Sequence, residues 1–312
     1  MENLMISLRC VLPIFLIICT GAIARRRNFV PEETFSNLSI FSFHTLIPCM
    51  LFYNIYASDL SLSFDPAMLL FLVGSLLLWF CLGMVVFHRF EPDPRTRGAY
   101  LQCFFRTHIA VFSVVLAENL LDPAGVASMA MAVAIITPLF NVLSVIALES
   151  CRGGTIHIPT ILKGILKNPL IPPCLLGIAF LVLGIRLPAP VEQALSTLGG
   201  AGSALTLIAL GASFQTDGLR KNWKKVLFCD FIRLILSPFA AVSCALLLGF
   251  RGNALGVILL ATAAPMATNT YPMAIACDSD HELTGQAVVT TAFLACFTLF
   301  LWIFLLKQFA FL

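Results

Sequence analysis

Ten largely apolar stretches follow one another along the chain, and most are long enough to cross a bilayer as a helix. A transmembrane helix needs about 20 residues, and backbone in lipid must satisfy its hydrogen bonds within helices or a closed barrel. The sequence lacks the ten-residue alternation of a membrane barrel. Charged residues make up 11% of the chain, against about 25% in soluble domains. The sequence therefore predicts an all-α integral membrane protein. Its predicted spans are 4–24, 34–55, 67–88, 98–120, 124–148, 169–185, 191–214, 224–248, 254–276 and 283–306.

The amino-terminal stretch, MENLMISLRCVLPIFLIICTGAIA, lacks the basic start and small-residue cleavage site of a secretory signal. We expect it to remain as the first span. The eleven cysteines lie mostly in apolar runs, where a thiol acts as a small hydrophobe, so no disulfide framework is expected. The sequence contains no HExxH, Cys/His metal spacing, GxSxG, Walker loop or GxGxxG pattern. We therefore expect neither an enzyme nor a primary pump, and no cofactor or metal.

Lysine and arginine are distributed unevenly between the loops on the two sides of the predicted spans. Thirteen follow spans 1, 3, 5 and 7, and four lie on the opposite side. Because cytoplasmic loops carry the excess of basic residues, both termini are expected outside the cytoplasm, in the cytoplasmic (inner) membrane. The net charge of +3 follows from this topology and predicts no nucleic-acid partner. The thirteen are Arg25, Arg26, Arg27, Arg89, Arg95, Arg97, Arg152, Lys163, Lys167, Arg220, Lys221, Lys224 and Lys225, and the four are Arg9, Arg186, Arg251 and Lys307.

The predicted ninth span contains the stretch APMATNTYP at residues 264–272. Pro265 and Pro272 each remove a backbone donor and clash with the preceding turn, at about 3 kcal/mol in a helix interior. Threonine and asparagine side chains at 268–270 add polar groups at membrane depth. This stretch therefore predicts a helix interrupted around a polar cluster.

Two segments half a chain apart resemble each other: VPEETFSNLS and LPAPVEQALS, offset by 157. Five predicted spans precede the midpoint and five follow it, so the second copy would be inverted in the membrane. The same offset places His108 on Pro265 and Val115 on Pro272, which predicts a matching interruption in the fourth span. At this offset Pro31, Leu38 and Ser39 align with Pro188, Leu195 and Ser196.

Paired interruptions in inverted halves are typical of the midplane substrate site of a secondary transporter. A broken helix leaves N–H and C=O groups without helical partners, and in a membrane these must be packed in protein or line a cavity. The starting end of a half-helix carries partial positive charge that favours an anion. No acidic residue lies inside either predicted interruption, which argues against a sodium/proton antiporter of similar architecture.

Seven sequence motifs are informative through their order and spacing. They are LPIFLIICTGAIARRRNFVPEE, HTLIPCMLF, FRTH, PLFNVLSVIALE, NPLIPPCLLGIAFLVLGIRLPAPVEQAL, LIALGASF and the interruption in the ninth span. Together they resemble the auxin efflux carrier family, which includes plant auxin exporters and bacterial carriers of malate or malonate, over essentially the whole chain. The resemblance implies ten spans in two inverted five-helix repeats, 1–150 and 151–312, with spans 4 and 9 crossing at their unwound middles. It also implies a scaffold domain (spans 1, 2, 6 and 7), a transport domain (spans 3–5 and 8–10) and a homodimer.

The fourth span departs from the family pattern, which has Asn, then Gly, then Pro at the interruption. Here these positions are His108, Ala110 and Val115. An imidazole replaces an amide and the first interruption lacks its proline. This departure bears on the identity of the substrate more than on the fold.

Asn269 is the residue that we expect to contact the substrate most directly, with Thr268 and Thr270 beside it. The alternative is that these side chains only join membrane helices through hydrogen bonds, worth about 0.6–2 kcal/mol. Tyr271 either closes the pocket or faces the membrane interface. Val115 and the two prolines of the ninth span are expected to shape the crossing rather than contact the substrate.

Three further side chains are candidates for the substrate site. His108 either titrates near neutral pH and supplies a charge for proton coupling or anion attraction, or stays neutral and hydrogen-bonded to a neighbour. Arg106 either binds a substrate carboxylate or snorkels to the helix end, and Asn141, in the fifth span, is a candidate to face the crossing. Outside the site, Asp230 and Arg233 are expected to pair with each other, or to form a coupling relay.

These features predict a secondary transporter of small organic anions, with carboxylates as the expected class. It would work by an elevator-like movement of the transport domain against the scaffold. An anion channel without alternating access is the alternative. The expected partners are the anion, membrane lipid, protons as a candidate coupling ion, and a second copy of the chain that docks on spans 2 and 7.

Overall fold

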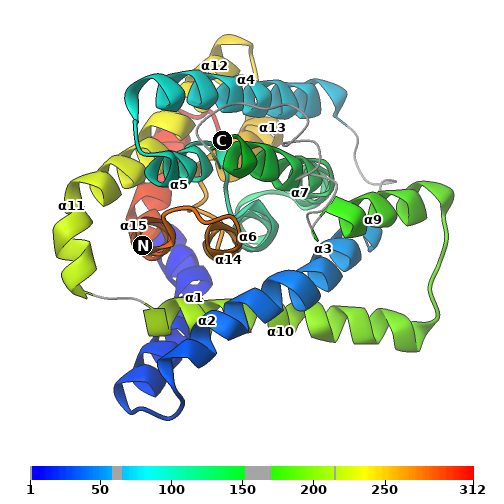
Figure 1. The fold of residues 1–312 in the computed structure, drawn as a ribbon. Coiled ribbons are helices and arrows are strands. Elements are labelled where there is room, and N and C mark those ends of the chain that lie inside the picture. Colours follow the sequence, from blue (N-terminus) through cyan, green and yellow to red (C-terminus); the bar gives the residue numbers. More distant parts are fainter. Residues whose placement is uncertain (1, 58–64, 152–168, 170, 214–215) are drawn as a thin grey trace.

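The structure, a computed structural model, describes residues 2–57, 65–151, 169, 171–213 and 216–312. These residues form helices and one isolated antiparallel bridge, between Thr107 and Met266 (Figure 1). The elements are α1 (Glu2–Arg26), α2 (Glu32–Phe41), η1 (Ser42–Leu46), α3 (Ile47–Tyr56), α4 (Pro66–Phe90), α5 (Pro94–Phe105), η2 (Ile109–Ser113), α6 (Val114–Leu120), α7 (Pro123–Cys151), α9 (Ile171–Leu183), α10 (Ala189–Ser213), α11 (Thr216–Phe231), η3 (Ile232–Leu236), α12 (Ser237–Leu247), α13 (Gly252–Ala263), α14 (Thr270–Ala276) and α15 (His281–Gln308).

Six helices of the described part are long and apolar enough to cross a membrane. They agree with the predicted class, an all-helical protein that crosses the membrane several times. The helix α13 is also apolar but has only 12 residues. The total of ten spans and their inverted arrangement stay predictions. The six helices are Glu33–Tyr56, Pro66–Phe90, Pro123–Cys151, Ala189–Ala212, Asn222–Leu247 and His281–Gln308.

Two of these helices contain a wider, π-helical turn just before a proline. In one, η1 precedes Pro48, and in the other, η3 precedes Pro238. Proline has no N–H to donate to the carbonyl four residues earlier. In the second helix that carbonyl belongs to Leu234, and it accepts a hydrogen bond from the indole Nε1 of Trp302 at 3.1 Å. The helix therefore continues past its proline because α15 satisfies the open backbone group.

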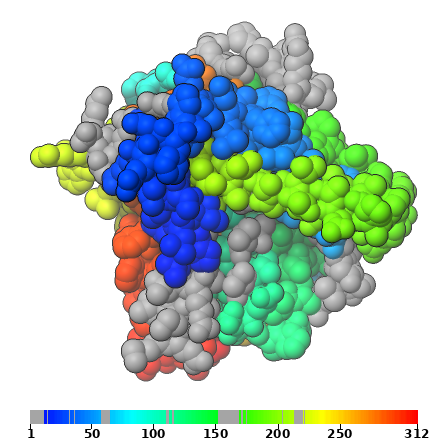
Figure 2. Space-filling view, turned by 90° about the horizontal axis from the view of Figure 1, so that it is seen from below, coloured from blue at the N-terminus to red at the C-terminus, as the bar shows by residue number. Residues whose placement is uncertain are grey.

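The helices pack in two groups, and Figure 1 shows the first group along the lower and right side of the molecule. In this group α10 packs on α1, α2 and α3, and α9 packs on α3. Figure 2 shows the amino-terminal helices (blue) beside α10 (yellow-green) on one face. A Cβ atom on Gly21 would lie 1.9 Å from the carbonyl oxygen of Ile208, and one on Gly211 would lie 1.9 Å from that of Ile18. The close approach of α1 and α10 therefore requires glycine at both positions.

The second group surrounds α5, α13 and α15. In this group α4 and α7 pack on α5, α7 and α12 pack on α13, and α11 packs on α15. Along α13, the side chains of Leu255, Val257, Ile258, Leu259 and Leu260 are 0% exposed. A helix that is apolar on every side is buried on every side. The end of α13 therefore lies deep in the protein, and its last carbonyl groups need partners there.

Candidate substrate-binding site

The first interruption lies between α5 and η2. Arg106, Thr107 and His108 lie outside the helices, and Arg106 has an extended backbone with φ −93° and ψ 123°. The helix resumes with η2, and Val115 is the second residue of α6. This break has no proline of its own, so it depends on contacts with the rest of the protein.

The second interruption separates α13 from α14 at residues 264–269. Pro265 has no N–H to give to the carbonyl of Ala261, four residues earlier. That carbonyl instead accepts a hydrogen bond from the hydroxyl of Thr107 at 2.9 Å. Pro272 lies in the first turn of α14, where backbone N–H groups have no helical partner in any case. The helix is therefore broken as predicted, and it resumes two residues before Pro272.

The two interruptions bond directly to each other. Thr107 and Met266 form the antiparallel bridge, and the N–H of His108 donates to the carbonyl oxygen of Pro265 at 2.8 Å. The N–H of Met266 donates to the hydroxyl of Thr291 on α15 at 3.2 Å. His108 and Pro265 are the two residues that the offset of 157 aligns. Each break thus supplies partners for backbone groups of the other.

Arg106 is buried beside the crossing, with 2% of its surface exposed. Its guanidinium donates to the hydroxyl of Ser144 and to the side-chain oxygen of Asn141, each at 2.7 Å. It also donates to the sulfur of Met273 at 2.9 Å. Arg106 therefore does not snorkel to a helix end. Its charge is oriented by α7, because Asn141 and Ser144 lie on the face of that helix that turns toward the crossing.

A cavity lies between the two interruptions and the helices α3 and α10. Its volume is about 60 Å³. Arg106 is the residue with a permanent charge among those that line it, and no lining residue is acidic. The cavity is thus a small, positively charged space. Its lining residues are Ile47, Met50, Leu51, Asn54, Arg106, Thr107, His108, Ile109, Thr137, Phe140, Asn141, Thr206, Ala267, Thr268 and Asn269.

Five of the predicted site residues line this cavity: Arg106, His108, Asn141, Thr268 and Asn269. The hydroxyl of Thr268 lies 3.3 Å from Nε2 of His108, so the two breaks also interact through side chains. Asn269 directly precedes α14, yet its side chain forms no capping hydrogen bond there. The amide of Asn269 is therefore not used to cap the helix that follows it.

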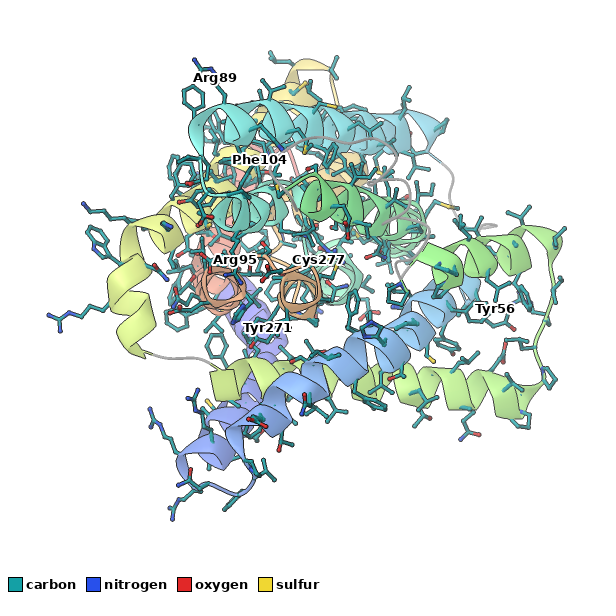
Figure 3. The ribbon with its side chains drawn as sticks, viewed as in Figure 1. Tyr56, Arg89, Arg95, Phe104, Tyr271 and Cys277 are labelled. Atoms are coloured by element: carbon teal, nitrogen blue, oxygen red, sulfur yellow. The ribbon has the colours of Figure 1, made fainter. Side chains whose placement is uncertain are left out.

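Two predicted residues do not line the cavity. The hydroxyl of Thr270 donates to the carbonyl oxygen of Ala267 at 2.5 Å, and Thr270 is fully buried. Tyr271 is 3% exposed and its ring packs against α15 beside Gly285. Figure 3 labels Tyr271 on α14. The geometry therefore does not support a substrate contact by Thr270 or Tyr271.

Four polar lining residues were not predicted from the sequence: Thr107 in the first interruption, Asn54 on α3, Thr137 on α7 and Thr206 on α10. The hydroxyl of Thr137 is buried and has no hydrogen-bond partner among the described residues. Thr137, Asn141 and Ser144 follow the i, i+4, i+7 spacing of one helix face. That spacing could have identified Thr137. No comparable signal marks Asn54 or Thr206.

Asp230 and Arg233 do not form the predicted ion pair. Asp230 accepts a hydrogen bond from the hydroxyl of Thr290 at 2.8 Å. Arg233 donates to the hydroxyl of Ser237 at 2.8 Å and to two backbone carbonyl groups. The prediction failed because three positions along a helix allow a contact but do not require one, and each side chain has nearer partners on other helices.

An all-helical membrane protein with two interrupted helices that cross beside a buried polar cavity has the architecture of a transporter. The sequence profile of a family described as membrane transport protein matches the chain twice, over residues 6–158 and 154–303. The chain therefore belongs to this family, the auxin efflux carrier family, and the resemblance found in the sequence is confirmed.

Two archaeal proteins are similar to parts of the chain. An uncharacterized transporter of Methanothermobacter thermautotrophicus is 30% identical over 129 residues, which are 41% of this chain and 42% of that protein. An uncharacterized transporter of Methanocaldococcus jannaschii is 24% identical over 154 residues, which are 48% of this chain and 50% of that protein. The alignments thus span about half or less of these relatives.

Proposed function

We propose that the protein is a secondary transporter of small organic anions, and that carboxylates bind in the cavity at the crossing. The observation that carries this proposal is the composition of the cavity wall: both interruptions, a buried arginine and no acidic residue. A positive charge in a space of low polarity attracts an anion more strongly than it would in water. The surrounding amides and hydroxyls supply the hydrogen bonds that a carboxylate loses when it leaves water.

Five polar lining residues have a role in this proposal. Arg106 supplies the positive charge. Asn141 orients the guanidinium of Arg106 by accepting a hydrogen bond from it at 2.7 Å. The amide of Asn269 and the hydroxyl of Thr137 donate to the carboxylate. The Thr137 hydroxyl has no partner among the described residues, so a bound acceptor would satisfy it. His108 is the candidate carrier of a coupling proton in this proposal.

We further propose that alternating access moves spans 3–5 and 8–10 against spans 1, 2, 6 and 7. One observation supports this movement. The cavity lies where the two helix groups meet, with α3 and α10 on one side and both interruptions on the other. Sliding at this boundary would carry the site across the membrane.

The membrane orientation and the dimer belong to the same proposal. The excess of basic residues in the loops supports an orientation with both termini on the non-cytoplasmic side of the cytoplasmic membrane. A homodimer would dock through the scaffold spans 2 and 7, because contacts on the transport domain would block its movement. On α10, Val191 is 43% and Leu198 is 44% exposed, which gives that helix apolar surface for a partner copy or for lipid.

Counterflow in proteoliposomes tests the carrier against the anion channel. A thermal-shift screen of dicarboxylates, indole acids and amino acids first identifies a ligand. Uptake of the labelled ligand is then measured with and without the same unlabelled ligand inside the vesicles. In a carrier, the binding site returns to the outside faster when it is loaded with ligand than when it is empty. Ligand inside the vesicles should therefore accelerate uptake. Uptake that is indifferent to internal ligand would identify a channel and would refute the proposal.

A further inference from the structure

Arg233 lies where the first halves of both interrupted helices end. It is 1% exposed. Its guanidinium donates to the carbonyl oxygen of Phe104 at 3.3 Å and also to that of Thr262. Phe104 and Thr262 are the penultimate residues of α5 and α13, and Figure 3 labels Phe104 within the upper group of helices. One side chain of η3 thus joins the carboxyl ends of two half-helices that are far apart in sequence.

The helix ends supply the counter-charge for this arginine. The last carbonyl groups of a helix have no partner within it, and together they carry about half a negative charge. Two such ends balance about one guanidinium charge. Arg233 forms no ion pair with any described acidic residue, and its Nε is buried without a described partner. The two half-helices are therefore the groups that compensate its charge.

The same group of acceptors is suited to a metal cation. Two backbone carbonyl oxygens, together with the hydroxyl of Ser237 at 2.8 Å, converge on the guanidinium. Oxygen atoms of this kind are the ligands of hard cations, and the carboxyl ends of half-helices coordinate sodium in transporters with broken helices. In this chain the guanidinium of Arg233 donates hydrogen bonds to these oxygens.

We propose that Arg233 acts as a tethered cation that joins the ends of α5 and α13 and so holds the shape of the crossing. It is a positioning residue: it lies behind the substrate cavity and does not line it. The inference concerns the assembly of the site and holds whichever anion is transported.

The surroundings of Arg233 make the proposal testable by chemical rescue. A second cavity, of about 340 Å³, borders Arg233 between α4, α12 and α13. Removal of the Arg233 side chain would enlarge this cavity and would not create a separate, closed one. A small cation could then occupy the place of the missing guanidinium.

The experiment measures thermal unfolding of the purified full chain in detergent. Arg233→Ala should lower the melting temperature by at least about 5 °C, and millimolar guanidinium chloride should restore part of this loss in a saturable way. Urea has nearly the same shape but no charge, and it should not restore the loss. Arg251→Ala is the matched control, because Arg251 donates to carbonyl groups near the end of α12 but is exposed. Its melting temperature should not respond to guanidinium.

Two results would overturn the proposal: no rescue by guanidinium, or equal rescue by urea. If Arg233→Ala does not fold, a second pair of variants tests the proposal. Arg233→Lys keeps the charge, whereas Arg233→Met keeps much of the volume. The proposal predicts a higher melting temperature for Arg233→Lys. A melting temperature of Arg233→Met equal to or above that of Arg233→Lys would show that the charge is not needed.

Discussion

The hydroxyl of Thr107 donates a hydrogen bond to the carbonyl oxygen of Ala261 over 2.9 Å. This acceptor is open because Pro265 has no N–H to fill it. The proline that breaks one helix therefore creates the acceptor that holds the middle of the other. This relationship explains how the first interruption forms although it contains no proline of its own.

The Thr107 bond predicts coupling between two substitutions. Thr107→Val keeps the side-chain shape but leaves the buried carbonyl of Ala261 open, which should cost about 1–3 kcal/mol of unfolding free energy. In a Pro265→Ala background, α13 can extend through residue 265 and bring the new N–H to the same carbonyl, so the cost of Thr107→Val should shrink. Unfolding of the two single variants and the double variant in detergent gives the coupling free energy.

Ser113→Ala is the control for this cycle. Its hydroxyl donates to the carbonyl oxygen of Leu260 at 2.7 Å, and Pro265 does not leave that carbonyl open. The cost of Ser113→Ala should therefore add to that of Pro265→Ala. An equal penalty for Thr107→Val in both backgrounds would contradict our account of the first break.

The position of Pro272 predicts an effect on rate rather than on affinity. Pro272 has no N–H to donate to the carbonyl of Thr268, four residues earlier. That carbonyl instead accepts from the N–H of Tyr271 at 3.3 Å. Pro272→Ala adds an N–H that favours extension of α14 back into the break. We expect slower counterflow with unchanged ligand affinity, and no change for Pro188→Ala in the loop before α10. A parallel fall in affinity and rate would instead place Pro272 in the binding site.

Much of this crossing could be predicted from the sequence, because proline acts locally and the internal offset transfers its position to the other half of the chain. The offset aligned His108 with Pro265, and these residues share a 2.8 Å hydrogen bond. The directions of individual side chains could not be predicted in this way. Each residue along a helix turns by about 100°, so the start of α14 at Thr270 decides that Thr270 and Tyr271 face away from the cavity.

The hydrogen-bond partners of the two buried arginines also could not be predicted from the sequence. Arg106 contacts α7 and Arg233 contacts the ends of α5 and α13. These contacts join helices far apart in the chain, and an arginine has several suitable acceptors within reach of its long side chain. Only the packing of the helices selects among them.

Asp93 predicts a pH dependence at the start of α5, outside the membrane. The hydroxyl of Thr96 donates to its carboxylate at 2.6 Å, and this bond, with backbone N–H bonds, lowers the pKa of Asp93 below its ordinary value of 3.8. A lowered pKa stabilises the folded protein above pH 3.8, and this contribution is lost as the pH falls through the folded value. Asp93→Asn should therefore lower the melting temperature at pH 7.

The difference between Asp93→Asn and the unchanged protein should close as the pH falls below 3.8. Glu33→Gln, at an exposed position of α2, is the control and should change the melting temperature little at any pH. A deficit of Asp93→Asn that persists undiminished at low pH would show that the charge of the carboxylate is not what stabilises the helix start.

Ligand binding by Asn269→Ala, measured by titration calorimetry, tests the central claim most directly. Loss of one buried hydrogen bond to a charged group costs about 1.5–3 kcal/mol, or roughly ten- to a hundredfold in affinity. The matched control is Asn253→Ala on α13, whose amide donates to Asp122 away from the cavity; it should leave affinity unchanged. The account predicts that Asn269→Ala folds normally and binds the carboxylate at least about tenfold more weakly. Binding equal to that of the unchanged protein would contradict it and leave the Asn269 amide as a link between helices only.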